Sequence, residues 1–134
     1  MVYLARCEDS KHGFVQKKDI SVAEGISADY VEQILIKLKT AGLIRSHRGK
    51  NGGFSLAKKA TKISVADVLK ATEGPINIAT CLEEKCDRIS VCVTRSLWQK
   101  ANKALESVFS GTTIADLAND VGKIRESKSL SFTI

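Results

Sequence analysis

Residues 27–56 read SADYVEQILIKLKTAGLIRSHRGKNGGFSL, and this stretch sets the expectation for the fold. Its first half has apolar residues at helical spacing. Ser27 is a favourable N-cap, and Gly42 can end the helix in a left-handed conformation. The period then changes, because residues 43–48 and 54–56 are short strand-like runs around a glycine-rich turn. A helix followed directly by a basic hairpin predicts a winged helix.

The residues before this stretch complete a helix-turn-helix. Residues 17–24 predict a short helix, and Gly25–Ser27 is a tight turn into the next one. Met1–Ala5 is apolar with no N-cap before it, so it is either a very short helix or the second half of one whose earlier residues lie outside this sequence. Residues 1–75 are therefore predicted to form a winged helix-turn-helix DNA-binding domain.

The positive charge lies in that domain. Residues 1–63 hold 12 Lys and Arg against 6 Asp and Glu, whereas residues 64–134 hold 9 of each. This distribution is typical of a polyanion-binding module joined to a neutral region, although a basic surface can also serve solubility alone. No apolar run approaches the roughly 18 residues of a membrane span, and no signal peptide opens the chain. We expect a cytoplasmic protein with no membrane partner.

The start of the second helix and the tip of the hairpin are the candidate DNA contacts. The helix start meets base edges in the major groove, where Glu32 can accept from cytosine, Gln33 can pair with adenine, and Tyr30 can reach a phosphate. At the tip, glycines allow close approach to a groove and basic side chains supply charge. The candidate residues are Ser27, Ala28, Asp29, Tyr30, Glu32, Gln33, Arg48, Gly49, Lys50 and Asn51. The alternatives are acidic residues that only favour the helix dipole, and an ordinary exposed turn.

The second half predicts further helices. Residues 57–62 are a basic surface loop, and Ser64–Asp67 resembles a capping box whose helix stops before Gly74–Pro75. Its inward residues are expected to be Val65, Val68 and Leu69. A longer helix is expected over residues 91–110, and residues 113–121 form a last short helix. Leu130–Ile134 alternates like a strand.

The longer helix is predicted to pair two subunits. Leu97, Ala101, Ala104 and Val108 follow a heptad-like seam, with Trp98 and Leu105 one position further round. The helix is thus apolar on more than one side, which favours packing on a second copy over a monomer with a large core. Residues 93–134 are accordingly assigned to a dimerisation helix, a short helix and a tail. The fold class is mainly α with a small β-hairpin wing.

Three of the four cysteines, Cys81, Cys86 and Cys92, fall within twelve residues in an aperiodic loop, residues 76–92. Such a cluster in a cytosolic protein indicates an iron–sulfur cluster, redox-active thiols or zinc, unless it is incidental. Zinc and iron–sulfur sites normally take four ligands. Three thiolates would leave one iron open to a weaker ligand, which suits a sensor. An enzyme with Cys92 as nucleophile would lack a nearby base, so we expect no enzyme.

Together these features resemble the Rrf-type transcription regulators, the family of the iron–sulfur regulator IscR and the nitric-oxide-sensing repressor NsrR. The resemblance lies in Gly25-Ile-Ser-x-x-Tyr30-x-Glu-Gln33, Leu35-x-x-Leu38-x-x-Ala-Gly-Leu43, Arg48-Gly-x-x-Gly-Gly-Phe54 and the three cysteines before Leu97-Trp98. It implies a homodimer on palindromic operator DNA, with a [2Fe–2S] or [4Fe–4S] cluster at the three cysteines. The implied function is a repressor that senses nitric oxide, iron or redox state. The alternative is a metal-free Rrf-type regulator that responds through thiol oxidation or a small ligand.

The resemblance has two departures. IscR-like members carry a histidine ligand three residues after the last cysteine, where this chain has Arg95. NsrR-like members instead take an acidic ligand from the start of the partner's first helix, a region that would lie upstream of Met1. The cysteine spacing and Arg95 are therefore more similar to NsrR, and the fourth ligand stays unassigned.

Overall fold

The computed structural model describes residues 1–8, 13–83 and 85–131, with side chains as far as residue 124. It is mainly α with one antiparallel hairpin, as predicted. The elements are α1 (Val2–Arg6), α2 (Lys17–Glu24), α3 (Ala28–Thr40), β1 (Ile44–His47), β2 (Gly53–Leu56), η1 (Ala60–Lys62), α4 (Val65–Glu73), η2 (Thr80–Leu82), α5 (Arg95–Gly111) and α6 (Ile114–Ser131).

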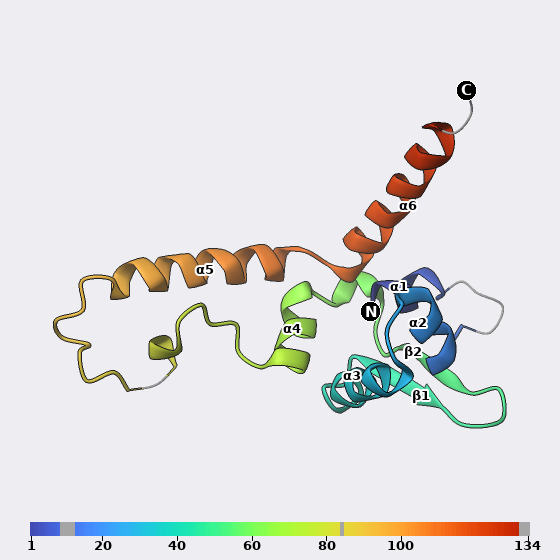
Figure 1. Cartoon of the computed structure of the whole chain (residues 1–134), viewed down its shortest axis with the longest axis horizontal. Coiled ribbons are helices and arrows are strands. Elements are labelled where there is room, and N and C mark those ends of the chain that lie inside the picture. Colours follow the sequence, from blue (N-terminus) through green and yellow to red (C-terminus); the bar gives the residue numbers. More distant parts are fainter. Residues whose placement is uncertain (9–12, 84, 132–134) are drawn as a thin grey trace.

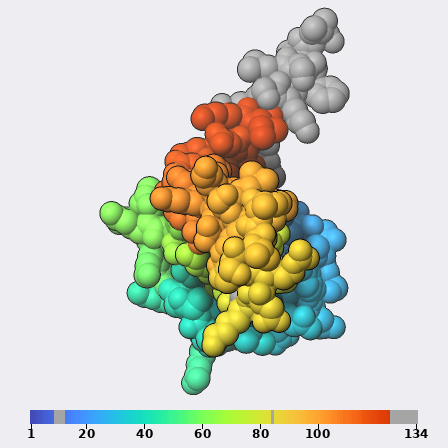
Figure 2. Space-filling view, turned by 90° about the vertical axis from the view of Figure 1, so that its left-hand side faces the viewer, coloured from blue at the N-terminus to red at the C-terminus, as the bar shows by residue number. Residues whose placement is uncertain are grey.

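The molecule has a body and an arm. The body contains α1 to α4 and the hairpin, which we call the wing (residues 44–56). The arm (residues 76–111) consists of the cysteine loop (residues 76–92), the turn that follows it and α5, and it extends away from the body (Figure 1). Figure 2, which faces the end of the arm, shows these residues in yellow and orange in front of the body. The cysteine loop therefore lies at the opposite end of the chain's long axis from the wing.

Helices α2 and α3 form the predicted helix-turn-helix. Gly25 ends α2 with a positive φ of 66°, and the Ser27 hydroxyl then caps α3 by accepting from the Tyr30 N–H at 3.2 Å. One stripe of α3 is buried, and its members are Val31, Leu35 and Leu38. The opposite face is left free at the surface. The sequence-based prediction of this helix and of its two ends is confirmed.

A one-residue β-bridge that the sequence did not indicate adds to the wing. β1 and β2 pair antiparallel, with His47 opposite Gly53. Val15, from the segment before α2, forms a bridge with Phe54 through two backbone hydrogen bonds of 2.9 and 2.8 Å. A Cβ on Gly53 would lie 2.5 Å from the Val15 carbonyl oxygen, so glycine is required where these strands meet. The bridge joins the wing to the start of α2.

Two capping boxes of the same design start α4 and α6. The Ser64 hydroxyl accepts from the Asp67 N–H at 3.1 Å, and the Asp67 carboxylate accepts from the Ser64 N–H at 2.9 Å. Thr113 and Asp116 exchange the same two bonds at 3.1 and 2.8 Å. The box at α4 was predicted with aspartate in the usual glutamate position, and it is confirmed.

The two capped helix starts lie side by side. The Val65 N–H donates to the Thr112 carbonyl at 2.9 Å, and the Ile114 N–H donates to the Ile63 carbonyl at 2.9 Å. Ile63 is fully buried at this junction. The return of the chain from the arm is therefore fixed to the N-terminal end of α4, and α6 begins from the same point.

These capping boxes predict loss of stability in acid. The hydrogen bonds from Ser64 and from Thr113 lower the pKa values of Asp67 and Asp116 below the ordinary 3.8. Their stabilisation is therefore fully present above pH 3.8 and disappears as the pH falls through the lowered values of the folded state. We expect the double variant Asp67→Asn with Asp116→Asn to unfold more readily at pH 7, with a flatter decline towards acid. Urea unfolding between pH 2 and 7 measures both effects; parallel curves for variant and wild type would contradict the prediction.

Two helix boundaries differ from the sequence-based predictions. α5 starts at Arg95 rather than at residue 91, because Val91, Val93 and Thr94 are β-branched and resist the first helical turn. α6 runs to Ser131 rather than ending at residue 121. Leu130 and Ser131, at the start of the tail whose alternation resembles a strand, belong to α6, and the last three residues of the tail lie outside the described part.

Two smaller expectations also change. In the basic loop of residues 57–62, η1 buries Ala60 against the core. In α4 the most buried residue is Ala66, while the expected inward residues Val65, Val68 and Leu69 are half-buried. Within the part of the chain that the structure describes, no helix combines the length and apolar character needed to cross a membrane.

Candidate nucleic-acid interface and cysteine loop

The start of α3 is an exposed polar surface. All six of its candidate residues are exposed, namely Ser27, Ala28, Asp29, Tyr30, Glu32 and Gln33. The ring of Tyr30 is large for such a position and is 53% exposed. The buried stripe of α3 holds the helix from behind, so these side chains are free to meet a ligand that approaches from solvent.

Glu32 differs from the other charged candidate on α3, Asp29, because it forms an ion pair. The Lys17 ammonium lies 2.6 Å from its carboxylate, which joins the start of α2 to the exposed face of α3. This hydrogen bond raises the pKa of Lys17 above the ordinary 10.5. The pair neutralises one acidic charge at the surface and fixes the direction of the Glu32 side chain. Sequence reasoning assigned Glu32 to a base contact and missed Lys17.

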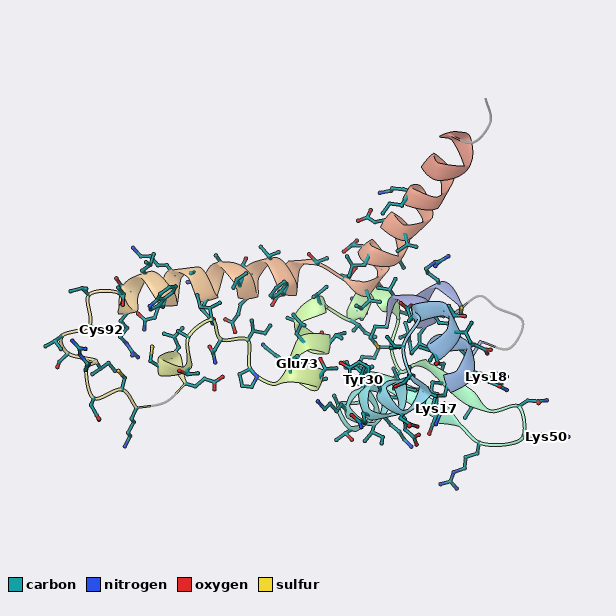
Figure 3. The ribbon with its side chains drawn as sticks, viewed as in Figure 1. Lys17, Lys18, Tyr30, Lys50, Glu73 and Cys92 are labelled. Carbon is teal, nitrogen blue, oxygen red and sulfur yellow. The ribbon has the colours of Figure 1, made fainter. Side chains whose placement is uncertain are left out.

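The four candidate residues of the wing, Arg48, Gly49, Lys50 and Asn51, are all exposed at its tip. Figure 3 shows Lys50 at the outermost point of the wing. The root of the wing is secured separately: the His47 ring stacks on Phe14 with 5.0 Å between centroids, and its Nε2 lies 2.7 Å from the Ser55 hydroxyl. These two contacts fix the root of the wing, which carries the basic tip.

A hollow of about 460 Å³ lies between the wing and the start of α2. Four basic side chains line it: Lys17, Lys18, Arg48 and Lys50. Positive charge from two elements that are distant in sequence therefore meets at one surface, next to the exposed end of α3. The sequence signal for the missed contribution of α2 was the Lys17-Lys18 pair at a predicted helix start.

The three clustered cysteines share one loop, but the structure does not bring them together as a metal site. Cys81 lies in η2, Cys86 and Cys92 lie in the turns that follow, and all three are free, half-buried thiols. In the described residues, no group of three or more His, Cys, Asp or Glu side chains is arranged to hold a metal ion. The donor chemistry of three thiols fits an iron–sulfur cluster; binding one would require the loop to close.

Cys92 has surroundings that favour its thiolate form. Its sulfur lies 3.5 Å from the Thr94 hydroxyl, and this contact, with backbone N–H groups and Arg88, lowers the pKa of Cys92 below the ordinary 9.0. Figure 3 places Cys92 at the far end of the arm. Cys7, by contrast, lies at the end of α1 and packs against the core of the body.

One contact connects the exposed helix to the base of the arm. The Lys37 ammonium, on α3, donates to the Thr72 carbonyl of α4 at 2.7 Å. Thr72 is in the last turn of α4, immediately before Gly74–Pro75, where the chain leaves the body. A cation at a helix C-terminus satisfies an otherwise unpaired carbonyl. This hydrogen bond therefore joins α3 to the end of α4 at which the arm begins.

The seam predicted on α5 is largely exposed in the single chain. Leu97 is 58% exposed, Val108 is 62% exposed and Trp98 is 39% exposed. Ala104 is exposed and Ala101 is half-buried. Large apolar side chains at these positions along one helix form an unpartnered surface, which in soluble proteins marks a contact with another molecule.

Comparisons with known proteins agree with this architecture. The model of the Rrf2 family, described as an iron-dependent transcriptional regulator, matches residues 1–120. Protein rrf2 of Nitratidesulfovibrio vulgaris is 42% identical over 108 residues, covering 79% of this chain and 72% of the relative. The HTH-type transcriptional regulator IscR of Yersinia pseudotuberculosis is 35% identical over 112 residues, covering 83% and 68%.

Solved structures give the same result. CymR, the global cysteine regulator of B. subtilis, is 31% identical with a TM-score of 0.72, covering 88% of this chain and 86% of that one. IscR of T. potens is 34% identical with a TM-score of 0.72, covering 90% and 78%. CymR of Staphylococcus aureus, solved in an oxidized form, is 31% identical with a TM-score of 0.69, covering 87% and 85%.

Proposed function

Because this chain belongs to the Rrf2 family, a family of transcriptional regulators and not of enzymes, we propose that it is a repressor whose operator affinity is set by an iron–sulfur cluster at Cys81, Cys86 and Cys92. The observation that carries the proposal is the mounting of three free thiols on an arm whose base contacts α3. The proposed stimulus is nitric oxide, iron or redox state, and the place of action is the cytoplasm.

On DNA, the exposed start of α3 would enter the major groove while the wing lies over an adjacent groove. Tyr30 and Gln33 are the proposed contacts to phosphate and adenine. Arg48 and Lys50 would meet the backbone or a narrow minor groove, and the wing glycines allow the backbone to approach closely. The basic hollow beside them supports this assignment because phosphate contacts supply much of the affinity for DNA.

Two copies would be required for a palindromic operator. We assign the dimer contact to the exposed seam of α5, where Leu97, Trp98 and Val108 are exposed large apolar side chains. In this arrangement residues 1–75 read DNA, residues 76–92 sense, and residues 93–134 pair the subunits. The cluster, when bound, would supply a centre that reacts with nitric oxide and oxidants.

The protein's own part is to hold that group and to change shape with it. The three cysteines would act as thiolate ligands, and the lowered pKa of Cys92 favours its thiolate form. Closing the cysteine loop would order residues 76–92 against α5. The fourth ligand would come from outside the three cysteines, since Arg95 at the next candidate position cannot bind iron.

A second candidate function is thiol-based sensing without a metal. It is favoured by two observations: Cys92 has the environment of a reactive thiol, and a structural relative, CymR of Staphylococcus aureus, has been solved in an oxidized form. In this alternative, oxidation of Cys92 would itself alter the cysteine loop. The DNA-reading surface would be the same in both cases.

The deciding experiment is anaerobic purification followed by iron and sulfide analysis and a visible spectrum. We expect stoichiometric iron and sulfide, visible absorption, and operator affinity that changes when the cluster is removed. Operator binding measured over a range of salt concentrations tests the DNA assignment, because phosphate contacts make affinity fall steeply with salt. Colourless protein without iron would reject the cluster, and salt-independent binding would reject the DNA surface.

Glu32 offers a sharper test of the reading surface. In Glu32→Gln the Lys17 ammonium loses its charged partner and can meet a phosphate, so we expect tighter binding to non-operator DNA and a salt slope steeper by about one. Discrimination between operator and scrambled DNA should fall, because the neutral glutamine amide accepts more weakly from cytosine than a carboxylate and its NH2 group can donate to other bases. Thermal stability should hardly change, since both side chains are exposed.

Asp29→Asn is the matched control for this variant. It removes the same charge from the same end of α3 but no hydrogen bond to Lys17. Fluorescence anisotropy with the two DNAs, at several salt concentrations, compares the variants. Equal effects for both would show that only the net charge matters, and would contradict a specific role for Glu32.

A further inference from the structure

Helix α5 holds the beginning of the cysteine loop at two points. The side-chain oxygen of Asn102 accepts from the Ile78 N–H at 3.1 Å. One side of the same helix also supplies Arg95, whose Nη1 donates to the Cys81 carbonyl at 3.4 Å. The two side chains are seven residues, or about two helical turns, apart, so they project from the same face. They therefore hold the segment of residues 78–81 at its first and last residues, and we call these two hydrogen bonds the clamp.

The Asn102 contact is the stronger half of this clamp. Asn102 is only 9% exposed and is the one residue of α5 that the structure buries, although its side chain is polar. An amide in such a place costs free energy unless it is hydrogen-bonded, and an apolar residue would pack there without that requirement. Its presence is explained by what it holds: a backbone N–H of the cysteine loop, 24 residues earlier in the chain.

The clamp has a direct connection to the reading surface. The C-terminal end of α5 leads to Thr112, whose carbonyl accepts from the Val65 N–H at the start of α4. At the other end of α4, the Thr72 carbonyl accepts from Lys37 of α3. A change in the position of the cysteine loop on α5 thus reaches α3 through backbone and side-chain hydrogen bonds at both ends of α4.

We propose that Asn102 is a positioning residue that fixes the cysteine loop on α5, so that a change of state at the cysteines is converted into a displacement of α5 and felt at α3. This inference rests on the proposed function, because it concerns how the state of the loop is read out. Asn102 itself touches neither the DNA nor a thiol; it acts through the Ile78 backbone. Without the hydrogen bond between Ile78 and Asn102, a change of state at the cysteines would still alter the cysteine loop, but it would not displace α5.

Two variants remove the same hydrogen bond from opposite sides. Asn102→Leu removes the acceptor while keeping a side chain of similar size, and Ile78→Pro removes the donor without altering α5. Lys103→Leu is the matched control, because it places the same leucine on the neighbouring, exposed position of the helix. Circular dichroism establishes that each variant is folded. If Asn102→Leu fails to fold, Ile78→Pro, whose change lies in a loop, decides the question.

The first measurement is amide hydrogen exchange over residues 79–82 in the cluster-free protein. Losing one hydrogen bond should speed exchange about fivefold in both clamp variants, and the control should match wild type. The second is the ratio of operator dissociation constants between the cluster-free and cluster-loaded forms. Allosteric ratios of about 5 to 150 are typical. We expect the ratio to fall to about one in both variants, while the cluster-free affinity stays within about twofold of wild type.

The outcomes separate this inference from the proposed function. Unchanged exchange in both clamp variants overturns the clamp. If exchange is faster in the clamp variants but their ratio of operator dissociation constants equals that of the wild type, the bond only stabilises the loop, and the positioning role is overturned. If the ratio of operator dissociation constants between the two forms is one in the wild-type protein, the proposed function is rejected, and with it the positioning role of Asn102. A wild-type ratio above one that is lost in both clamp variants and kept in Lys103→Leu supports the inference.

Discussion

Replacing Arg48 and Lys50 together with glutamine is expected to weaken operator binding by about 10- to 100-fold at physiological salt and to lower the salt slope by about two. Both side chains are exposed at the tip of the wing and border the same basic hollow as Lys17 and Lys18. Each cation near a phosphate displaces about one counterion. The loss should be similar for operator and scrambled DNA if the wing meets phosphates, and larger for the operator if Arg48 occupies a narrow minor groove.

The matched control is the pair Lys100→Gln with Lys103→Gln. It makes the same change in net charge, on exposed positions of α5 in the arm. Anisotropy titrations at several salt concentrations should give this pair a wild-type slope. If both pairs weaken binding equally, affinity depends on the overall charge and the wing is not a contact. Thermal unfolding excludes a loss of fold, which is not expected because the root of the wing is held by Val15 and by the His47 stack on Phe14.

The helix-turn-helix could be predicted from the sequence because its signals are local. The Ser27 cap, the apolar stripe of α3 and the glycines that end each helix all act within a few residues. The capping box at Ser64 could be predicted for the same reason. Contacts between distant segments could not be predicted, because they produce no pattern of residue spacing in the sequence. The bridge of Val15 to Phe54 and the ion pair of Lys17 with Glu32 are examples.

The arm was less predictable, and for physical reasons. The cysteine loop has no hydrophobic period, so its course depends on single contacts such as the bond from Asn102 to Ile78, which no sequence pattern encodes. The start of α5 was placed too early because a cysteine and β-branched residues intervene before Arg95. The spacing of the cysteines predicted that they share a loop. It could not predict that, in the described residues, the three thiols are not arranged as a group that could hold a metal ion.

Single replacement of Cys81, Cys86 or Cys92 with alanine is expected to abolish the cluster and, with it, the dependence of operator affinity on the cluster. Each thiolate would be one of only three cysteine ligands, so the loss of any one leaves too few to retain iron. We expect no visible absorption and an affinity ratio between reconstituted and untreated protein of about one, against about 5 to 150 for wild type. Cys7→Ala is the control, because Cys7 packs at the end of α1 in the body.

The pattern among these variants separates the cluster from thiol-based sensing. A cluster needs all three cysteines, so the three variants should be equally defective in anaerobic reconstitution. Thiol oxidation instead depends on the most reactive sulfur, and the contact with Thr94 lowers the pKa of Cys92 in particular. Alkylation of the cluster-free protein at pH 7 should therefore modify Cys92 before Cys81 or Cys86. If Cys92→Ala alone abolishes the response to oxidant while Cys81→Ala and Cys86→Ala keep it, the sensor is a thiol. A cluster held by three cysteines would instead be lost in each of the three single variants.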